Sequence, residues 1–212
     1  MPVAGMMTPT RTETYQNLQL NAGIFLYNFN YEEYATIDAL RTAVLAKIQA
    51  NENILGSTRG GGSFVVTQDV REPEVDGARY RFKGGSFVDS VDANMTGTLL
   101  EVTPENFKYI LATGDVDNSV ATRIKVTMHT RINAADHLDN LVWIGDIADG
   151  SLVMIVLKNA LNTNGMNLTF TDKGEGTMPF EFHAYQDKVE DYDSAPFEVF
   201  FLRPAATTGG AG

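Results

Sequence analysis

The chain contains no cysteine, three histidines and one tryptophan among its 212 residues. Without cysteine it can form neither disulfides nor thiolate metal sites, and it has no cysteine nucleophile. The histidines, His129, His137 and His183, form no His-x-His pair and no HExxH motif, so the sequence gives no sign of a zinc site. No serine lies in a G-x-S-x-G motif. The sequence therefore predicts a protein that is not an enzyme and needs no metal or cofactor.

Basic residues and long apolar runs are also scarce. Lysine and arginine number 16 against 27 aspartates and glutamates, which gives a formal net charge of −11 at pH 7. This charge repels phosphate and argues against a protein that binds the phosphate backbone of nucleic acid tightly. No apolar segment is long enough for a membrane span, and residues 1–10 have no basic region followed by an apolar one. We expect folding inside a cell and no membrane insertion.

The composition favours one domain with an arm at each end. Hydrophobic residues make up 43% of the chain, enough for a sizeable core. Residues 1–20, rich in Thr, Pro, Met and Asn, are predicted to be an N-terminal arm, and residues 21–203 are predicted to form the domain. The small residues and glycines of 204–212 predict a flexible C-terminal tail.

Two helices are predicted from capping residues and spacing. Thr36 can cap an amphipathic helix of about four turns, whose apolar face should lie against a sheet. That face consists of Ile37, Leu40, Val44, Leu45 and Ile48. The second helix is short: Thr103 is its cap, Pro104 its first residue, and Gly114 can end it.

Most of the remaining chain is predicted to be antiparallel strand, because turn dipeptides separate its β-rich runs. The dipeptides are Asp76-Gly77, Asp149-Gly150 and Asn164-Gly165. A further turn is predicted at residues 173–176 (KGEG), and the predicted strands are residues 23–29, 64–75, 79–83, 141–147, 152–157, 168–170 and 178–184. Residues 152–157 are apolar on both faces, as in the middle of a sandwich. The predicted fold is thus mainly β, an antiparallel β-sandwich with one flanking α-helix and one short helix.

Residues 86–102 form an unusually long strand candidate, spanning about 55 Å at about 3.3 Å per residue. The strand must either bend near Gly97 or run beyond its own domain. One face of it is polar and carries no lysine or arginine, and it includes Ser90, Asp92, Asn94, Thr96 and Thr98. This face is either an ordinary solvent-exposed surface or the wall of a passage through which a polyanion slides without binding.

Three further patterns have no clear catalytic meaning. Gly60, Gly61 and Gly62 precede a strand and lack the Lys-Ser/Thr pair of a phosphate-binding loop, so they are predicted to be a hinge or a close backbone approach. The acidic groups at 69–76 and 187–193 lack the EF-hand spacing and are predicted to be solvated loops. In residues 123–132 apolar and polar side chains alternate, which predicts a strand with one polar face.

Several segments together resemble the major tail tube proteins of long-tailed bacteriophages, over roughly residues 18–202. They are residues 18–25 (LQLNAGIF), 55–64 (LGSTRGGGSF), 97–106 (GTLLEVTPEN), 157–162 (LKNALN), 170–176 (FTDKGEG) and 179–184 (PFEFHA). The resemblance implies a ring-forming β-sandwich subunit, with six copies in a ring and rings stacked into a tube. Genomic DNA and the tape measure protein would pass through it, and tail tip or terminator proteins would close its ends.

The resemblance also implies roles for particular residues. The polar strand face, Ser90, Asp92, Asn94, Thr96 and Thr98, would face the lumen. Contacts between subunits or rings would involve Arg59, Gly60, Gly61, Gly62, Phe64, Arg123, Lys125 and Arg131. Residues 59–83 would be a loop or hairpin that orders on stacking, with a simple surface hairpin as the alternative.

Two other identities are considered. One is a capsid decoration or host-recognition β-sandwich that acts as a binding module. The other is the inner tube of a contractile tail or a phage-tail-like bacteriocin. The tail tube interpretation places the protein in the virion tail, after assembly in the bacterial cytoplasm.

Overall fold

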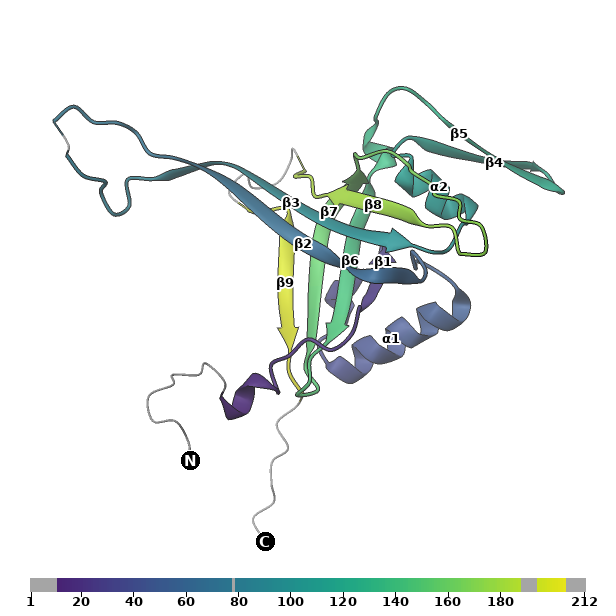
Figure 1. The fold of residues 1–212 in the computed structure, drawn as a ribbon, viewed down its shortest axis with the longest axis horizontal. Helices are drawn as coiled ribbons and strands as arrows, with labels where there is room; N and C mark the ends of the chain where they lie inside the picture. The colour runs from purple at the N-terminus through teal and green to yellow at the C-terminus, as the bar shows by residue number, and fades with distance from the viewer. Residues whose placement is uncertain (1–10, 78, 188–193, 205–212) are drawn as a thin grey trace, which may run out of the picture.

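The fold is mainly β, with antiparallel strands and two α-helices (Figure 1). A computed structural model describes residues 11–77, 79–187 and 194–204. The arm predicted at 1–20 is therefore described only from residue 11, and nearly all of the predicted tail lies outside the described residues. The helical elements are η1 (Thr12–Thr14), η2 (Tyr31–Glu33), α1 (Ile37–Ala50), α2 (Pro104–Ile110) and η3 (Ala134–Asp136). The strands are β1 (Ile24–Tyr27), β2 (Thr58–Arg71), β3 (Phe87–Leu99), β4 (Gly114–Val120), β5 (Arg123–Met128), β6 (Leu138–Asp146), β7 (Leu152–Asn162), β8 (Met178–His183) and β9 (Phe197–Leu202).

Strand β7 belongs to two sheets. Its first residues lie between β6 and β9 in a sheet of order β1-β6-β7-β9. Its last two residues, Leu161 and Asn162, pair with β8 in a second sheet that continues through β3 to β2. Between these two parts Asn159 has a left-handed φ of 47°, which redirects the strand. One continuous strand thus joins the two sheets.

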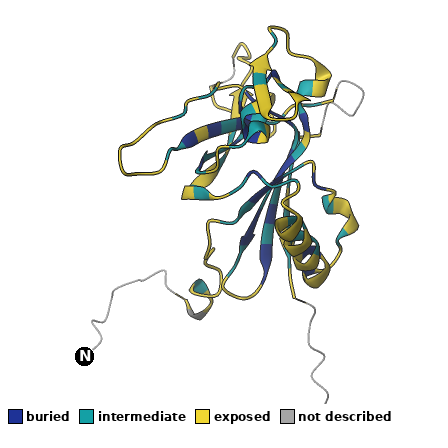
Figure 2. Ribbon diagram, turned by 90° about the vertical axis from the view of Figure 1, so that its right-hand side faces the viewer, coloured by how far each residue is buried: buried dark blue, intermediate teal, exposed yellow. Residues whose placement is uncertain are grey.

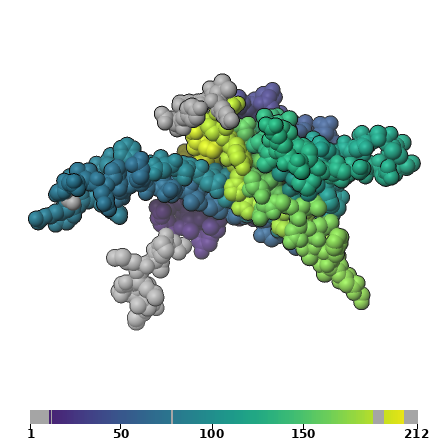
Figure 3. Space-filling model, turned by 90° about the horizontal axis from the view of Figure 1, so that it is seen from above, coloured from purple at the N-terminus to yellow at the C-terminus, as the bar shows by residue number. Residues whose placement is uncertain are grey.

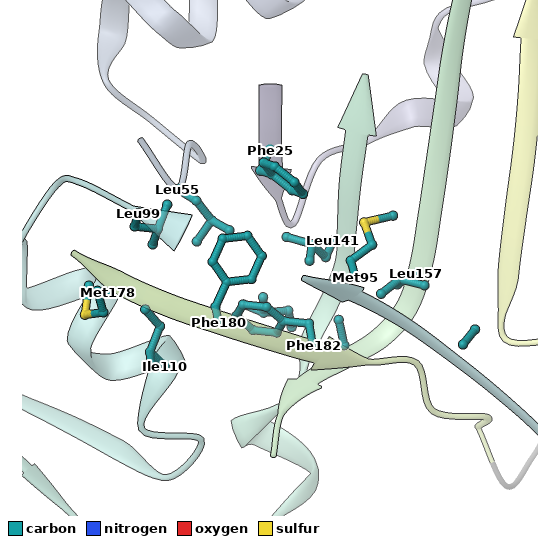
Figure 4. Close-up of a cluster of buried hydrophobic side chains, with 13 residues drawn as sticks. Phe25, Leu55, Met95, Leu99, Ile110, Leu141, Leu157, Met178, Phe180 and Phe182 are labelled. Atoms are coloured by element: carbon teal, nitrogen blue, oxygen red, sulfur yellow. The ribbon is translucent and has the colours of Figure 1, made fainter. Parts of the chain in front are cut away.

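The larger core lies between these two sheets, as in a sandwich (Figure 4). The rings of Phe25 and Phe180 meet edge to face with their centroids 5.2 Å apart. The side chains packed around them come from both sheets and include Met95, Leu99, Leu141, Leu157, Met178 and Phe182. Burial of these apolar groups is the main stabilising contribution, at about 25 cal/mol per Å² removed from water.

Helix α1 covers the opposite face of the β1-β6-β7-β9 sheet. Ile37 and Leu40 pack there against Leu26, Val142 and Val156 in a second core. The molecule therefore has three layers, and β7 is buried from both sides, as its sequence predicts. Farther along α1 the outer side chains are exposed (Figure 2). Only the first part of the predicted apolar face is thus buried.

The predicted caps explain where both helices begin. Thr36 Oγ1 accepts a hydrogen bond from the Ala39 N–H of α1 at 3.3 Å. In α2, Thr103 Oγ1 accepts from the Asn106 N–H at 3.1 Å, and Pro104 is the first helical residue. The end of α2 differs from the prediction, because the helix stops at Ile110 and Gly114 begins β4 instead.

Two strand predictions are wrong, and the segment 59–83 shows which of its alternatives holds. Residues 79–83 are not a strand, because the turn at Asp76-Gly77 lies within a loop that joins β2 to β3. Residues 168–170 form only an isolated bridge, between Thr169 and Thr177. Residues 59–83, predicted as a loop or hairpin, contain most of β2 and much of the loop that joins it to β3, so they already belong to a hairpin in the single chain. Whether a segment forms a strand depends on the strand that it pairs with, and local residue preferences do not identify that partner.

The long β2–β3 hairpin extends far beyond the two sheets (Figure 1). Strand β3 has 13 residues without a break at Gly97, and its register with β2 runs from Thr58↔Leu99 to Arg71↔Phe87. At about 3.3 Å per residue, β3 is about 40 Å long. Of the two alternatives for this strand, the structure shows the second, a strand that runs beyond its domain.

Asn162 is buried where α2, β7 and β8 meet. Its Nδ2 donates to the carbonyls of Ile110 and Gly165, at 2.6 and 3.0 Å, and its Oδ1 accepts from the Glu181 N–H at 2.9 Å. We predict that Asn162→Ala lowers the free energy of unfolding by about 2 kcal/mol, because buried backbone groups lose their partners. Urea denaturation measures this change.

Asn164→Ala is the matched control, since that exposed side chain makes a hydrogen bond only to the Glu181 side chain among the described residues. Its effect should stay below about 0.5 kcal/mol. Equal losses in the two variants would contradict a structural role for Asn162.

Candidate functional site

The outer face of the β8-β3-β2 sheet is a largely polar surface. On β3, Asp92, Asn94, Thr96 and Thr98 alternate with the buried residues of the core, so they point away from it. Ser90 lies on the same side of the strand but farther out, where it pairs with Asp69 and is exposed. The register places polar neighbours from β2 and β8 on the same face. These neighbours are Ser63, Thr67, Asp69, Glu181 and His183, and Val65 and Pro179 also lie on this face. Below, this surface is called the polar face.

Side-chain bonds link all three strands of the polar face. The hydroxyls of Ser63 and Thr96 lie 2.7 Å apart. His183 Nδ1 lies 2.8 Å from Asp92 Oδ1, and its Nε2 lies 3.5 Å from Glu181 Oε1. The imidazole is thus held between two carboxylates, and its side chain is only 22% exposed. The Asn94 Oδ1 is buried and has no hydrogen-bond partner among the described residues.

The charges of the polar face have one sign. Its ionisable groups are Asp69, Asp92, Glu181 and His183, and no lysine or arginine lies at the positions named above. Strands β3 and β8 contain no lysine or arginine at all. His183 is the one basic side chain at these positions, and two carboxylates face it. This surface therefore offers no unpaired cation to a phosphate group.

Predicted contact residues of β2 lie at the inner end of the hairpin. Arg59 Nη2 pairs with Glu175 Oε2 at 2.6 Å, and this arginine lowers the pKa of Glu175. Gly60 and Gly61 have a φ of 76° each, where the register of β2 shifts. A Cβ on Gly62 would collide with the Thr96 carbonyl oxygen, so its backbone approaches β3 closely, one of the two predicted alternatives for this triplet.

Phe64 packs within its own chain. Its ring meets that of Phe197 at a centroid distance of 5.5 Å, and it lies against the core between the sheets. Phe64 is thus partly buried within its own chain, and only the rest of its side chain is left for the predicted contact with another subunit.

The other predicted contact residues lie far from the polar face, on the small sheet formed by β4 and β5. Arg123 and Lys125 belong to β5, whereas Arg131 follows it, because this strand ends at Met128 and not near residue 132 as predicted. None of the three forms an ion pair within 4.0 Å with any described residue. The candidate residues thus divide into the polar face, the inner end of the β2–β3 hairpin and the β4–β5 sheet.

At the base of the β4–β5 sheet, His129 links strand β4 to η3. His129 Nδ1 lies 3.0 Å from Asp115 Oδ2 of β4, and its Nε2 lies 3.1 Å from Asp136 Oδ2 of η3. Hydrogen bonds to Asp115 and then to Asp136 raise the pKa of His129. Burial tends to raise the pKa of Asp136, but the Asn133 N–H and His129 outweigh this and lower it. Both shifts favour the ion pair.

These two histidine clusters were not predicted from the sequence. The pairs His183–Asp92 and His129–Asp136 are separated by 91 and 7 residues, and neither follows a known spacing motif. Only the register between β3 and β8 brings His183 close to Asp92. The sequence pattern can indicate each strand, but it does not show which residues of two neighbouring strands lie opposite each other.

Within the described ranges, no group of histidine, aspartate and glutamate side chains has an arrangement that could hold a metal ion. No helix in the described part of the chain has the length and apolar character needed to span a membrane. No protein-family model matches the sequence, and no curated protein matches it significantly.

The His129 ion pair makes the stability of the β4–β5 sheet depend on pH. Because the folded pKa of His129 is raised, the stabilisation is complete below the unfolded value of about 6.5 and is lost as pH rises through the folded value. We predict that His129→Gln speeds hydrogen exchange in β4 and β5 more at pH 6 than at pH 9, after correction for intrinsic rates. An equal effect at both pH values would show that the charge of His129 is not involved.

Proposed function

We propose that the chain is the structural subunit of a bacteriophage tail tube. Six copies would close into a ring, and rings would stack into a hollow conduit that carries genomic DNA into the host. The subunit would bind copies of itself, the tape measure protein, and the tail tip or terminator proteins. It would be assembled in the bacterial cytoplasm and remain in the virion tail. DNA would only pass through and would not be held.

The observation that carries this proposal is the polar face without lysine or arginine. A conduit for DNA needs a wall that offers hydrogen bonding to water but no fixed cation to phosphate. The polar face supplies hydroxyls, amides and carboxylates on three adjacent strands. Its single imidazole is held by Asp92 and Glu181. In a ring of six, this face would be the bore.

The free edges of the sheets support a ring. Strand β2 pairs only with β3 among the described strands, so the other edge of this 14-residue strand is open. Open edges with unpaired N–H and C=O groups promote uncontrolled pairing unless another chain covers them. A closed ring of identical subunits removes such edges, because the edge of each sheet meets that of its neighbour.

The projecting β2–β3 hairpin supports stacking. Its loop carries large apolar side chains that no part of the described chain covers: Tyr80 is 84% exposed and Phe82 is 68% exposed. Ion pairs Arg71–Asp89 and Arg81–Glu72 hold the arms of the hairpin together, at 2.9 and 2.7 Å. This projecting arm with its apolar tip would reach the next ring, where its aromatic side chains become buried.

Two alternatives make different predictions. A capsid decoration or host-recognition module would form discrete particles and would bind its target through exposed loops. The inner tube of a contractile tail or a phage-tail-like bacteriocin would form the same kind of tube, and a neighbouring gene for a sheath would identify it. The polar face and the open edge of β2 favour a tube over a decoration protein.

The first test is negative-stain electron microscopy of the purified chain over a range of concentrations. We expect hollow tubes of uniform width, formed alone or after addition of tail tip proteins that start assembly. Discrete closed particles, or monomers that persist at high concentration with tip proteins present, would contradict the proposal.

The second test adds a cation to the polar face. Asp92→Lys changes the charge by two units per copy, and each Lys–phosphate contact is worth about 1 kcal/mol in water. We predict that tubes still form but release DNA more slowly, and that added salt restores the rate. The rate of DNA ejection from assembled particles measures this effect.

Asp172→Lys is the matched control, because it makes the same charge change at an exposed turn outside the polar face. Its ejection rate should equal that of the parent chain. If Asp92→Lys also leaves the rate unchanged, the polar face does not line the bore.

A further inference from the structure

The β4–β5 sheet projects from the body of the molecule (Figures 1 and 3). It is a separate two-stranded sheet, and no third described strand pairs with it. Two strands alone are only marginally stable in water. Its base is held by α2, by the His129 cluster and by two bonds between Thr113 and His129. Its outer half has no such support within the described residues, which makes a contact with another chain the natural way to stabilise it.

One face of this sheet is apolar and largely uncovered. The register pairs Val116 with Val126, so these two residues share a face with Ile124 and Met128. Val116 and Val126 are partly buried, but Ile124 is 53% exposed and Met128 is 59% exposed. The opposite face carries the polar side chains of β5. An amphipathic sheet with an exposed apolar face is typical of a surface that binds a partner.

A second uncovered apolar surface lies on α1. Leu40 is buried, but Leu45 and Ile48 on the next turns are 56% and 46% exposed. Between this part of α1 and strand β6 lies a groove of about 370 Å³. The apolar side chains that line it are Ile24, Leu40, Val44, Leu45, Ile48, Ile144 and Leu152. The ion pair between Arg41 and Asp146 lines it as well. The groove explains why the sequence places five apolar residues on α1 although only two of them are buried.

The charges near these two surfaces are complementary. Residues 114–132 carry three basic and two acidic side chains, in a chain whose net charge is −11. Residues 30–53 carry four acidic and two basic side chains. The two basic residues of this segment, Arg41 and Lys47, already pair with Asp146 and Glu52. The negative charges of Glu32, Glu33 and Asp38 therefore have no basic partner within 4.0 Å in the described chain.

We propose that the β4–β5 sheet of one copy docks, apolar face inward, into the α1 groove of the neighbouring copy in the ring. Ile124 and Met128 enter the groove, and Arg123 approaches the acidic surface around the N-terminus of α1. The two surfaces differ. Each copy would therefore contact one neighbour through its β4–β5 sheet and the other neighbour through its α1 groove. Such a head-to-tail contact gives a closed ring when the rotation from one copy to the next divides a full turn, as in a ring of six. This proposal depends on the proposed function, because it assumes a ring.

Because the chain has no cysteine, disulfide crosslinking tests this contact cleanly. One full-length variant would carry Ile124→Cys together with Leu45→Cys, and a second would carry Met128→Cys together with Ile48→Cys. Assembled tubes would be oxidised and then separated on a denaturing gel without reductant. We expect a ladder of covalent oligomers up to the closed ring for at least one pair. The control is Thr127→Cys with Leu45→Cys, since Thr127 lies on the opposite face of the sheet.

A matched pair of charge variants tests the same contact even if the introduced cysteines lie too far apart to form a disulfide. Ile124→Asp places a carboxylate against the apolar side chains of the groove, so we expect at least a tenfold loss of sedimentable tubes. Thr127→Asp introduces the same charge on the opposite side of the β4–β5 sheet and should assemble normally. Both sites are exposed, so both variants should fold as the parent does.

The outcomes separate this proposal from the proposed function. If tubes form, no pair crosslinks and Ile124→Asp assembles like Thr127→Asp, the docking is wrong and the tail tube function stands. If the parent chain makes no tubes even with tip proteins, both are wrong. A ladder that appears equally with Thr127→Cys would show random collision and would also overturn the docking.

Discussion

The burial of β7 on both faces is the constraint on which the rest of the structure depends. One side of this strand packs into the core between the sheets, through residues such as Leu157. The other packs under α1, through Met154 and Val156. Because one strand serves both sheets, the left-handed turn at Asn159 sets the position of β8, and β8 in turn sets β3 and β2. Loss of this packing would therefore displace the polar face as well as the core.

The charge distribution is consistent with a subunit that must bind its own copies while it avoids DNA. Strong negative charge makes copies repel one another, so contacts need local charge of the other sign. Arg123 and Lys125, two of the basic residues without an ion pair among the described residues, lie on the β4–β5 sheet, away from the polar face. On the polar face, the carboxylates of Asp92 and Glu181 lie beside His183. In the proposed tube, contacts between copies and the DNA-facing wall would therefore lie on different parts of one acidic chain.

The sequence was sufficient to predict the parts of the fold that depend on local chemistry. Thr36 and Thr103 cap the helices where expected, and Asp149-Gly150 joins β6 to β7. The alternation along β3 predicted which of its residues point away from the core. In these cases a residue and its near neighbours decide the conformation, through capping, turn geometry or the two-residue period of a strand.

The sequence was not sufficient where distant segments meet. The glycines at 60–62 lie inside β2 because a bulge and the close approach of Thr96 suit them there, and no local signal shows that β3 lies opposite. The bond between His183 and Asp92 depends on the register of β8 with β3. The exposed end of the apolar face of α1 depends on how far the sheet beneath it extends, which periodicity does not reveal.

The central claim is that the outer face of the β8-β3-β2 sheet lines a bore made by identical copies. A cryo-electron microscopy reconstruction of the assembled protein tests it most directly. The account predicts a hollow tube in which Asp92, Asn94 and Thr96 point toward the axis and no lysine or arginine reaches the lumen. A solid particle, or a bore lined by basic side chains, would contradict it.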